Sequence, residues 1–172
     1  MNFTDSLRKN FHHELTTCQH LYAKFSAESA EWKPQDNMRN TVQLMQYLTY
    51  IGKAMVRQYV TTPADPEAAR NAYRADAKWA TENVTFENFS DMIELEKKEI
   101  SDMLAGISDA DLERETYHPF SGDVFSLYEG LFTTIRYVCA YRHQLFLYAK
   151  MNGAEINTLN NWYGKDPAPK AA

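Results

Sequence analysis

Glycine and proline, which interrupt helices more often than other residues, are scarce in this sequence. The 172 residues include six of each, about 7% of the chain against a usual share near 12% for the two together. The prolines leave long uninterrupted stretches between them. A chain with this composition is expected to be rich in helix.

Cysteine is scarce as well, and lysine and arginine form no cluster. The two cysteines, Cys18 and Cys139, stand in apolar helical patterns and are too few for a disulfide framework. The formal net charge is −5, so nothing in the sequence would neutralise a phosphate backbone. Nucleic acid is therefore not expected as a partner.

The sequence also lacks the patterns of a spanning helix and of a signal peptide. No apolar run approaches the roughly 18 residues that a spanning helix needs. Residues 1–14 carry charges and two histidines where a signal peptide would have an apolar core. With 44% hydrophobic and 24% charged residues, the composition is that of a folded, soluble chain. We expect a cytoplasmic protein with no membrane partner.

Apolar residues at spacings of three and four predict long amphipathic helices. The predicted helices cover about Thr4–Ala30, Met38–Thr61, Asn88–Ile107 and Asp123–Asn152, with a shorter helix between Pro66 and Asn83. Four long helices with short links predict an all-α fold, an antiparallel four-helix bundle over residues 1–164. Residues 165–172 are rich in proline, alanine and lysine and are expected to form a flexible tail.

The fourth predicted helix is apolar on almost every side, so we expect it to lie inside the bundle and to be covered all round. Its apolar residues off the main stripe offer more surface than three neighbouring helices would cover. These residues are Phe125, Phe132, Cys139 and Phe146. We therefore expect a homodimer.

The histidines do not form an evident metal site. His13 and His20 share a face of the first helix away from its apolar stripe, and we expect both at the surface. His143 is expected at the edge of the core or at an interface. Glu115 and His118 form a single Glu-x-x-His pair, whereas a di-iron bundle needs two such pairs.

The tyrosines form a clearer pattern. Tyr137, Tyr141 and Tyr148 lie on one face of the fourth predicted helix, and Tyr47 lies on an apolar face of the second. Spacing alone is compatible with ordinary core packing in which each hydroxyl finds a partner.

Several motifs together resemble one known family. The segment Tyr141–Gly153 resembles the signature His-Arg-x-Gln-Leu-x-x-Tyr-Leu-Arg-x-x-Gly of the DinB-like, or YfiT-like, four-helix bundle family, which is unrelated to the DNA polymerase of similar name. Further similar runs occur in the same order along nearly the whole chain. They are Trp32–Pro34, Arg39–Met45, Leu104–Leu112, Ser126–Leu131 and Trp162–Gly164.

The resemblance implies where a metal site would lie. In the family, one histidine of the second helix and two of the fourth bind a divalent metal. The corresponding positions here are Tyr47, Tyr137 and Tyr141. Deprotonating one phenol at pH 7 costs about 4 kcal/mol, because its reference pKa is about 10. His143 lies two residues from Tyr141, about 200° round the helix, and cannot replace the lost ligand.

The resemblance therefore implies a degenerate metal site with no metal cofactor, in a protein that is non-catalytic or metal-independent. Its tyrosine-lined pocket would bind a small molecule or be filled. Two alternatives stay open: a metal-dependent thiol S-transferase or hydrolase with unusual ligands, and a structural or regulatory homodimer.

Overall fold

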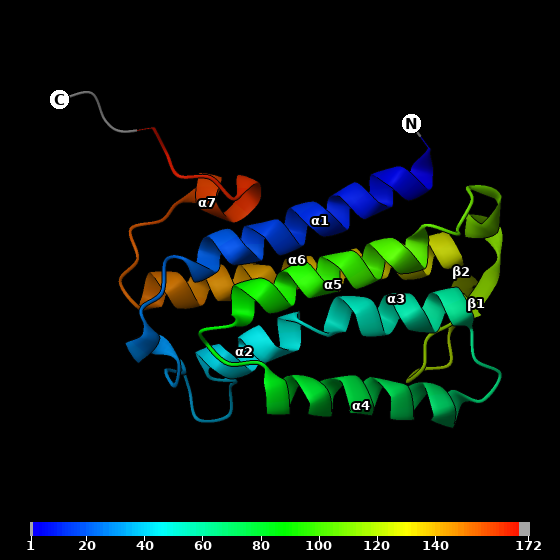
Figure 1. Ribbon diagram of the computed structural model, residues 1–172, viewed down its shortest axis with the longest axis horizontal. Helices are drawn as coiled ribbons and strands as arrows, with labels where there is room; N and C mark the ends of the chain where they lie inside the picture. Colours follow the sequence, from blue (N-terminus) through cyan, green and yellow to red (C-terminus); the bar gives the residue numbers. More distant parts are fainter. Residues whose placement is uncertain (1, 169–172) are drawn as a thin grey trace.

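The computed structural model describes residues 2–168, and most of these residues lie in helices along one long axis (Figure 1). The helices are α1 (Phe3–Tyr22), α2 (Thr41–Leu48), α3 (Ile51–Thr61), α4 (Pro66–Asn83), α5 (Phe89–Leu104), α6 (Leu127–Met151) and α7 (Thr158–Tyr163). Residues 2–168 also contain two short 3₁₀ helices, Ala27–Ser29 and Ala110–Glu113, and two strands, β1 (Glu115–Tyr117) and β2 (Val124–Ser126). The predicted all-α bundle is confirmed.

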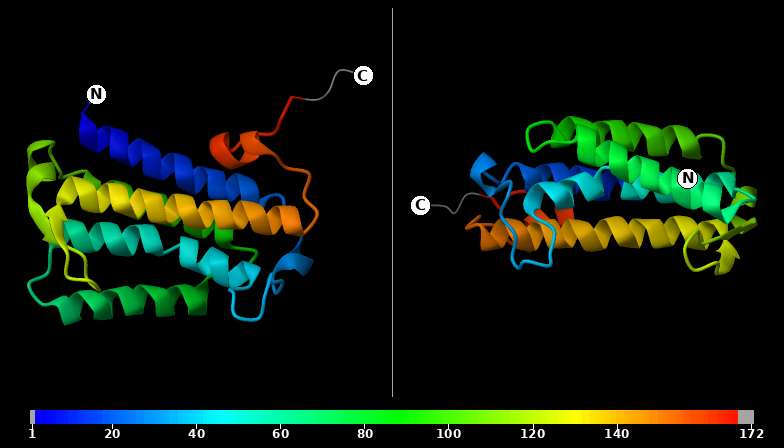
Figure 2. Two further views of the ribbon diagram at one scale, coloured as in Figure 1. Left: turned by 180° about the vertical axis from the view of Figure 1, so that it is seen from behind. Right: turned by 90° about the horizontal axis from the view of Figure 1, so that it is seen from below.

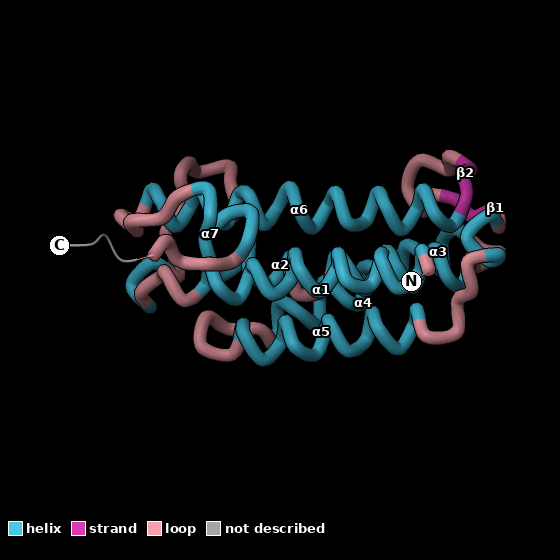
Figure 3. The backbone as a smooth tube through the Cα atoms, turned by 90° about the horizontal axis from the view of Figure 1, so that it is seen from above, coloured by secondary structure: helices cyan, strands magenta, loops and turns pink. Residues whose placement is uncertain are grey.

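The bundle consists of α1, α2–α3, α5 and α6. Helix α1 packs against α5 and α6, and α3 packs against the same two helices, so that α5 and α6 lie on opposite sides (Figure 3). Helix α4 lies outside this bundle, against α2 and α3 (Figure 2). Because α4 returns the chain, α2–α3 and α5 run in one direction while α1 and α6 run in the other.

The apolar stripes that predicted the helices form the core. Buried side chains include Phe11 and Leu15 of α1, Leu44 of α2, Ile93 of α5 and Leu131 of α6. No helix within residues 2–168 has the length and apolar character needed to cross a membrane.

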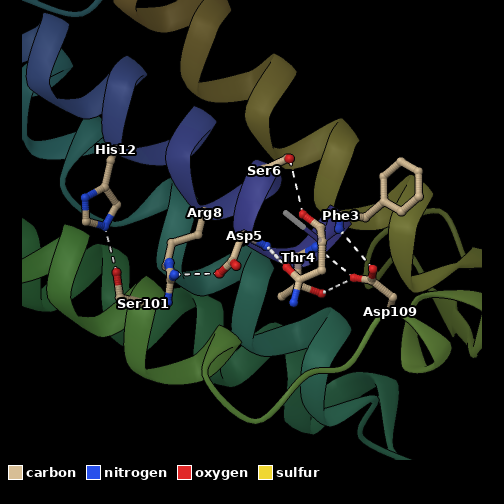
Figure 4. A network of polar contacts seen from close by, with 9 residues as sticks. Phe3, Thr4, Asp5, Ser6, Arg8, His12, Ser101 and Asp109 are labelled. Atoms are coloured by element: carbon tan, nitrogen blue, oxygen red, sulfur yellow. Dashed lines mark hydrogen bonds and ion pairs between the residues drawn. The ribbon is translucent and has the colours of Figure 1, made fainter.

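The start of α1 is held by its own cap and by Asp109, which lies 106 residues after Phe3 in the sequence. Asn2 caps the helix by accepting from the Asp5 amide at 2.7 Å. Asp109 accepts from the Phe3 and Thr4 amides, both at 3.1 Å (Figure 4). These two bonds to backbone amides lower the pKa of Asp109. The free amides of the first turn are thereby satisfied.

The first predicted helix is shorter than expected. It ends at Tyr22 and not near Ala30, because the chain tightens into three-residue turns in which the Lys24 and Phe25 amides donate to the Leu21 and Tyr22 carbonyls. The third ends at Leu104, three residues before the predicted Ile107.

The second predicted helix is broken. Helix α2 ends at Leu48, and α3 begins at Ile51 after Tyr50, whose side chain caps nothing. The cap comes from α5, where Glu96 Oε1 accepts from the Lys53 amide at 3.1 Å. A Cβ atom on Gly52 would lie 2.6 Å from the same oxygen, so only glycine leaves room for the carboxyl group.

Glu96 is fully buried. Burial raises its pKa to about 8, against the opposing effect of the Lys53 amide. The other carboxyl oxygen, Oε2, has no hydrogen-bond partner among the described residues. The neighbouring Lys53 is buried too, and its ammonium group pairs with Glu99 at 2.7 Å.

The segment before the fourth helix was predicted wrongly. That helix begins at Leu127 and not near Asp123, because residues 115–117 and 124–126 pair as an antiparallel hairpin. Its loop contains Pro119 and the left-handed Gly122, with φ of 79°. Ser126 and Glu129 then form a capping box that starts α6.

Helix α7 was not predicted, and it covers part of α1. Asn160 donates to His20 Nε2 at 3.0 Å, so His20 is half-buried, whereas His13 is exposed as predicted. Asp166, within the predicted tail, pairs with Lys24 at 2.6 Å. Residues 169–172 of that tail lie outside the described residues.

Arg142 connects three helices from a buried position on α6. Its Nε donates to Glu14 of α1 at 2.5 Å, and its Nη1 donates to Asn161 Oδ1 of α7 at 2.6 Å. His143, next to it, is exposed and accepts from Asn161 Nδ2 at 3.1 Å.

We expected α6 to be covered on all sides, but in the single chain part of its surface is exposed. Of the four residues off its main stripe, Phe132 is 48% exposed, whereas Phe146 is buried and Phe125 and Cys139 are half-buried. Tyr128, one turn before Phe132, is 42% exposed and stacks on it with ring centroids 6.2 Å apart.

Glu96→Gln is expected to change how stability depends on pH. The folded chain holds a proton on Glu96 up to about pH 8, whereas the unfolded chain releases it near pH 4.5. The free energy of unfolding of the wild type therefore falls as pH rises between these values, by up to about 4 kcal/mol. Urea unfolding at pH 5, 6.5 and 8 measures this fall.

The glutamine keeps an acceptor for the Lys53 amide but does not titrate, so the fall should be smaller in Glu96→Gln. Glu94→Gln, an exposed change on the same helix, is the control and should keep it. Equal pH dependence in the wild type and Glu96→Gln would contradict the assignment.

Candidate functional site

A hollow of about 160 Å³ lies where α2, α3, α4, the β1–β2 loop and α6 meet. All three tyrosines singled out in the sequence, Tyr47, Tyr137 and Tyr141, line it. The other lining residues are Ile51, Met55, Tyr73, His118 and Phe120. We call this hollow the tyrosine pocket.

Aromatic rings form its walls. The Tyr47 and Tyr141 ring centroids are 4.4 Å apart, and Tyr47 also lies 5.2 Å from Tyr50. Tyr73 of α4 continues the wall, 5.5 Å from Tyr50 and 5.1 Å from Phe120 of the hairpin loop. The pocket thus offers ring faces, with phenol hydroxyls as its main polar groups.

Two phenols of this aromatic wall, those of Tyr47 and Tyr50, are harder to ionise than usual. Burial raises the pKa of Tyr47, and the neighbouring phenols of Tyr73 and Tyr141 raise it further. Burial also raises the pKa of Tyr50, with Tyr73 adding to the effect. Both groups are neutral near pH 7.

His118, which sequence reasoning had set aside, belongs to this site. It lies in the hairpin loop, and its Nε2 is 3.4 Å from the Tyr137 hydroxyl. Burial lowers the pKa of His118 although the nearby Asp123 opposes this. The sequence shows His118 as part of a Glu-x-x-His pair, but its approach to α6 depends on the hairpin.

The bonds of His118 determine its tautomer. Its Nδ1 accepts from the amides of Phe120, at 3.3 Å, and Ser121, at 3.2 Å. A nitrogen that accepts two bonds carries no proton, so neutral His118 is protonated on Nε2. This Nε2–H donates to the Tyr137 oxygen, which leaves the Tyr137 O–H free to donate into the pocket.

Tyr59 lies one turn beyond Met55 on α3. It is fully buried, and its hydroxyl has no hydrogen-bond partner among the described residues. A Cβ atom on Gly130 of α6 would lie 2.9 Å from its ring, so Tyr59 packs directly on the α6 backbone.

A second hollow of about 340 Å³ adjoins the tyrosine pocket and shares Tyr47 with it. Its other lining residues are Arg39, Gln43, Gln46, Tyr50, Ala77 and Thr81. We call it the α2–α4 cleft. The Arg39 guanidinium lies 4.3 Å from the centroid of the Tyr47 ring and 5.7 Å from that of Tyr141. Arg39, Tyr73 and His118 were all missed by sequence reasoning.

No acidic residue lines either hollow within the described chain. In residues 2–168, no three His, Cys, Asp or Glu side chains are grouped closely enough to hold a metal ion. A neutral phenol is a weak ligand for zinc and similar ions, which bind deprotonated or imidazole ligands. The chemistry available in the tyrosine pocket is hydrogen bonding and ring contact, and the α2–α4 cleft adds the positive charge of Arg39.

The His118 tautomer gives a direct test by NMR. Long-range ¹H–¹⁵N spectra should show a proton on Nε2 and a bare Nδ1, with a pKa below the usual 6.5 because burial disfavours the imidazolium. Tyr137→Phe removes the Nε2 acceptor and should shift the Nε2 resonance. A proton on Nδ1 at neutral pH would contradict the geometry.

Comparisons with known proteins agree with the fold. No protein-family model matches the chain, and no curated protein matches it. Among solved structures, the crystal structure of the DinB-like protein YjoA from Bacillus subtilis superimposes with a TM-score of 0.66 at 14% sequence identity. The match covers 88% of this chain and 95% of YjoA. The chain has a DinB-like fold.

Proposed function

We propose that this protein binds a small molecule in the tyrosine pocket and that the pocket is a degenerate form of a DinB-like metal site. The observation that carries the proposal is the convergence of Tyr47, Tyr137 and Tyr141 on one hollow. A hollow of about 160 Å³ between ring faces matches an engineered cavity of about 150 Å³ that binds benzene.

The polar groups support a ligand that accepts hydrogen bonds. Tyr137 donates no bond to His118, since His118 already donates to it, and its O–H is free for a ligand. A tyrosine hydroxyl can donate one bond besides those it accepts, and here its contact with His118 uses only an acceptor position. A bound molecule or ordered water would supply the acceptor for that bond.

The donor set does not fit a divalent metal. Each phenol costs about 4 kcal/mol to deprotonate at pH 7 even at its ordinary pKa, and burial raises the pKa of Tyr47 further. His118 offers no lone pair to the pocket, because its Nε2 carries the proton while Nδ1 accepts two amides. We therefore propose that the protein is non-catalytic or metal-independent at this site.

Elemental analysis tests the metal part of the proposal. Protein purified without chelator should contain well below one zinc, nickel, manganese or iron per chain. One metal per chain, lost in a Tyr137→Phe and Tyr141→Phe double variant, would overturn it and favour the metal-dependent transferase or hydrolase.

NMR titration tests the proposal that the pocket binds a small molecule. NMR titration with small aromatic compounds should shift the His118 ring signals in the wild type. Met55→Trp, which fills the pocket, should abolish the shift, and the exposed change Met151→Trp serves as the control. No shift with any aromatic compound would contradict a binding role.

We also propose a homodimer through the face that α1 and α6 share. Three aromatic side chains gather there: Phe3 is 66% exposed, and Tyr128 and Phe132 are exposed as described above. They line a hollow of about 150 Å³ in which no charged residue of the described chain takes part. A second copy could cover this apolar face through a two-fold axis.

Phe132→Glu is expected to weaken this dimer, because the face would have to bury a charge. Light scattering should give about twice the 19.9 kDa chain mass for the wild type and the single-chain mass for the variant. Leu159→Glu, an exposed apolar position on α7, is the control and should stay dimeric. A wild-type mass near one chain at high concentration would contradict the dimer.

A further inference from the structure

The tyrosine pocket and the α2–α4 cleft meet at Tyr47. Charge is distributed unevenly between these two hollows. The pocket side has phenols, apolar side chains and the His118 imidazole, whose pKa burial lowers. The cleft side has one cation, Arg39, and neutral amide and hydroxyl groups. The combined lining therefore has a positive charge that no lining carboxylate compensates.

Arg39 has no acidic partner among the described residues, although many acidic side chains are available. Several other arginines are paired with carboxylates, among them Arg57 with Asp76 and Arg142 with Glu14. The carboxylates near Arg39 in sequence are used elsewhere, since Asp36 pairs with Lys33 and Glu31 accepts from Asn40. The guanidinium instead lies against the Tyr47 ring.

The position of Arg39 is fixed from α6. Its carbonyl accepts from the Tyr148 hydroxyl at 2.9 Å, and that hydroxyl accepts from Gln144 Nε2 at 3.1 Å. The Tyr47 ring then orients the guanidinium by a cation–π contact. A guanidinium held by its face keeps its N–H edge free for a planar oxyanion.

We propose that this site binds a small aromatic monocarboxylate, with its ring in the tyrosine pocket and its carboxylate on Arg39. This rests on the proposed binding role of the pocket and names the class of ligand. A single arginine matches a single negative charge, and the pocket has the volume of one six-membered ring. A phosphate dianion would leave charge uncompensated, since the N-terminus of α2 is already capped by Asn40.

The ligand's carboxylate accepts two parallel bonds from the Arg39 edge, as planar carboxylates do with arginine. The Tyr137 O–H lies on the pocket side, where it donates to a polar ring substituent or to an ordered water. The proposal involves no bond making or breaking.

Isothermal titration calorimetry with phenylacetate tests the proposal, with phenylacetamide as the neutral compound of the same shape and phenyl phosphate as the dianion. The wild type should bind phenylacetate more tightly than the other two. Arg39→Gln should weaken phenylacetate binding about 10- to 100-fold, the range of one charge-assisted pair of bonds. Its binding of phenylacetamide should change little.

The matched control is Arg136→Gln, an exposed arginine of α6 that lines neither hollow. It should bind all three compounds as the wild type does. Arg39→Lys keeps the charge without the planar edge and should lie between the wild type and Arg39→Gln. Arg39 is exposed, and circular dichroism should confirm that its variants fold.

The outcomes separate this inference from the binding role. Equal binding of phenylacetate and phenylacetamide, unaffected by Arg39→Gln, would overturn the carboxylate assignment and leave the pocket as a binding site. Tighter binding of phenyl phosphate would overturn it in favour of a phosphate ligand. If none of the compounds binds or shifts the His118 signals, both this inference and the binding role fail.

Discussion

The buried carboxyl group of Glu96 is the constraint on which the centre of this bundle depends. It takes the place of a local cap for α3, so the break at Thr49 and Tyr50 is held by a contact with α5. The tyrosine pocket spans that break, with Tyr47 before it and Ile51 after it. Burying an acid there is costly, and the fold retains it because the free amides of a buried helix start must have an acceptor.

The second constraint is the way α4 and the hairpin close the pocket. Helix α4 stands outside the bundle and contributes Tyr73, and the hairpin loop contributes His118 and Phe120. Neither segment belongs to the four helices that form the core. The bundle thus supplies three of the tyrosines that line the pocket, while the peripheral segments supply the remaining wall and the histidine that contacts Tyr137.

The sequence predicted the helical class and most of the core because apolar periodicity is a local property of each helix. It could not predict the break in α2–α3, since the cap for α3 comes from Glu96, 43 residues after Lys53. The convergence of Tyr47 and Tyr141 followed from a family resemblance and not from spacing. Arg39 and His118 were missed because loops place them, and a loop residue carries no periodic signal.

Gly130 never touches the pocket, yet it bears on the pocket's width. At that turn the Tyr59 ring of α3 lies directly against the α6 backbone, and it lies with Phe125 where a side chain on residue 130 would stand. A Cβ atom there would push the two helices apart, because the Tyr59 ring is fully buried and the packed core leaves no space into which it can move. The absence of a side chain at Gly130 therefore lets α3 and α6, which carry Met55 and Tyr137, approach closely. A larger residue at position 130 would change the width of the tyrosine pocket without replacing any residue that lines it.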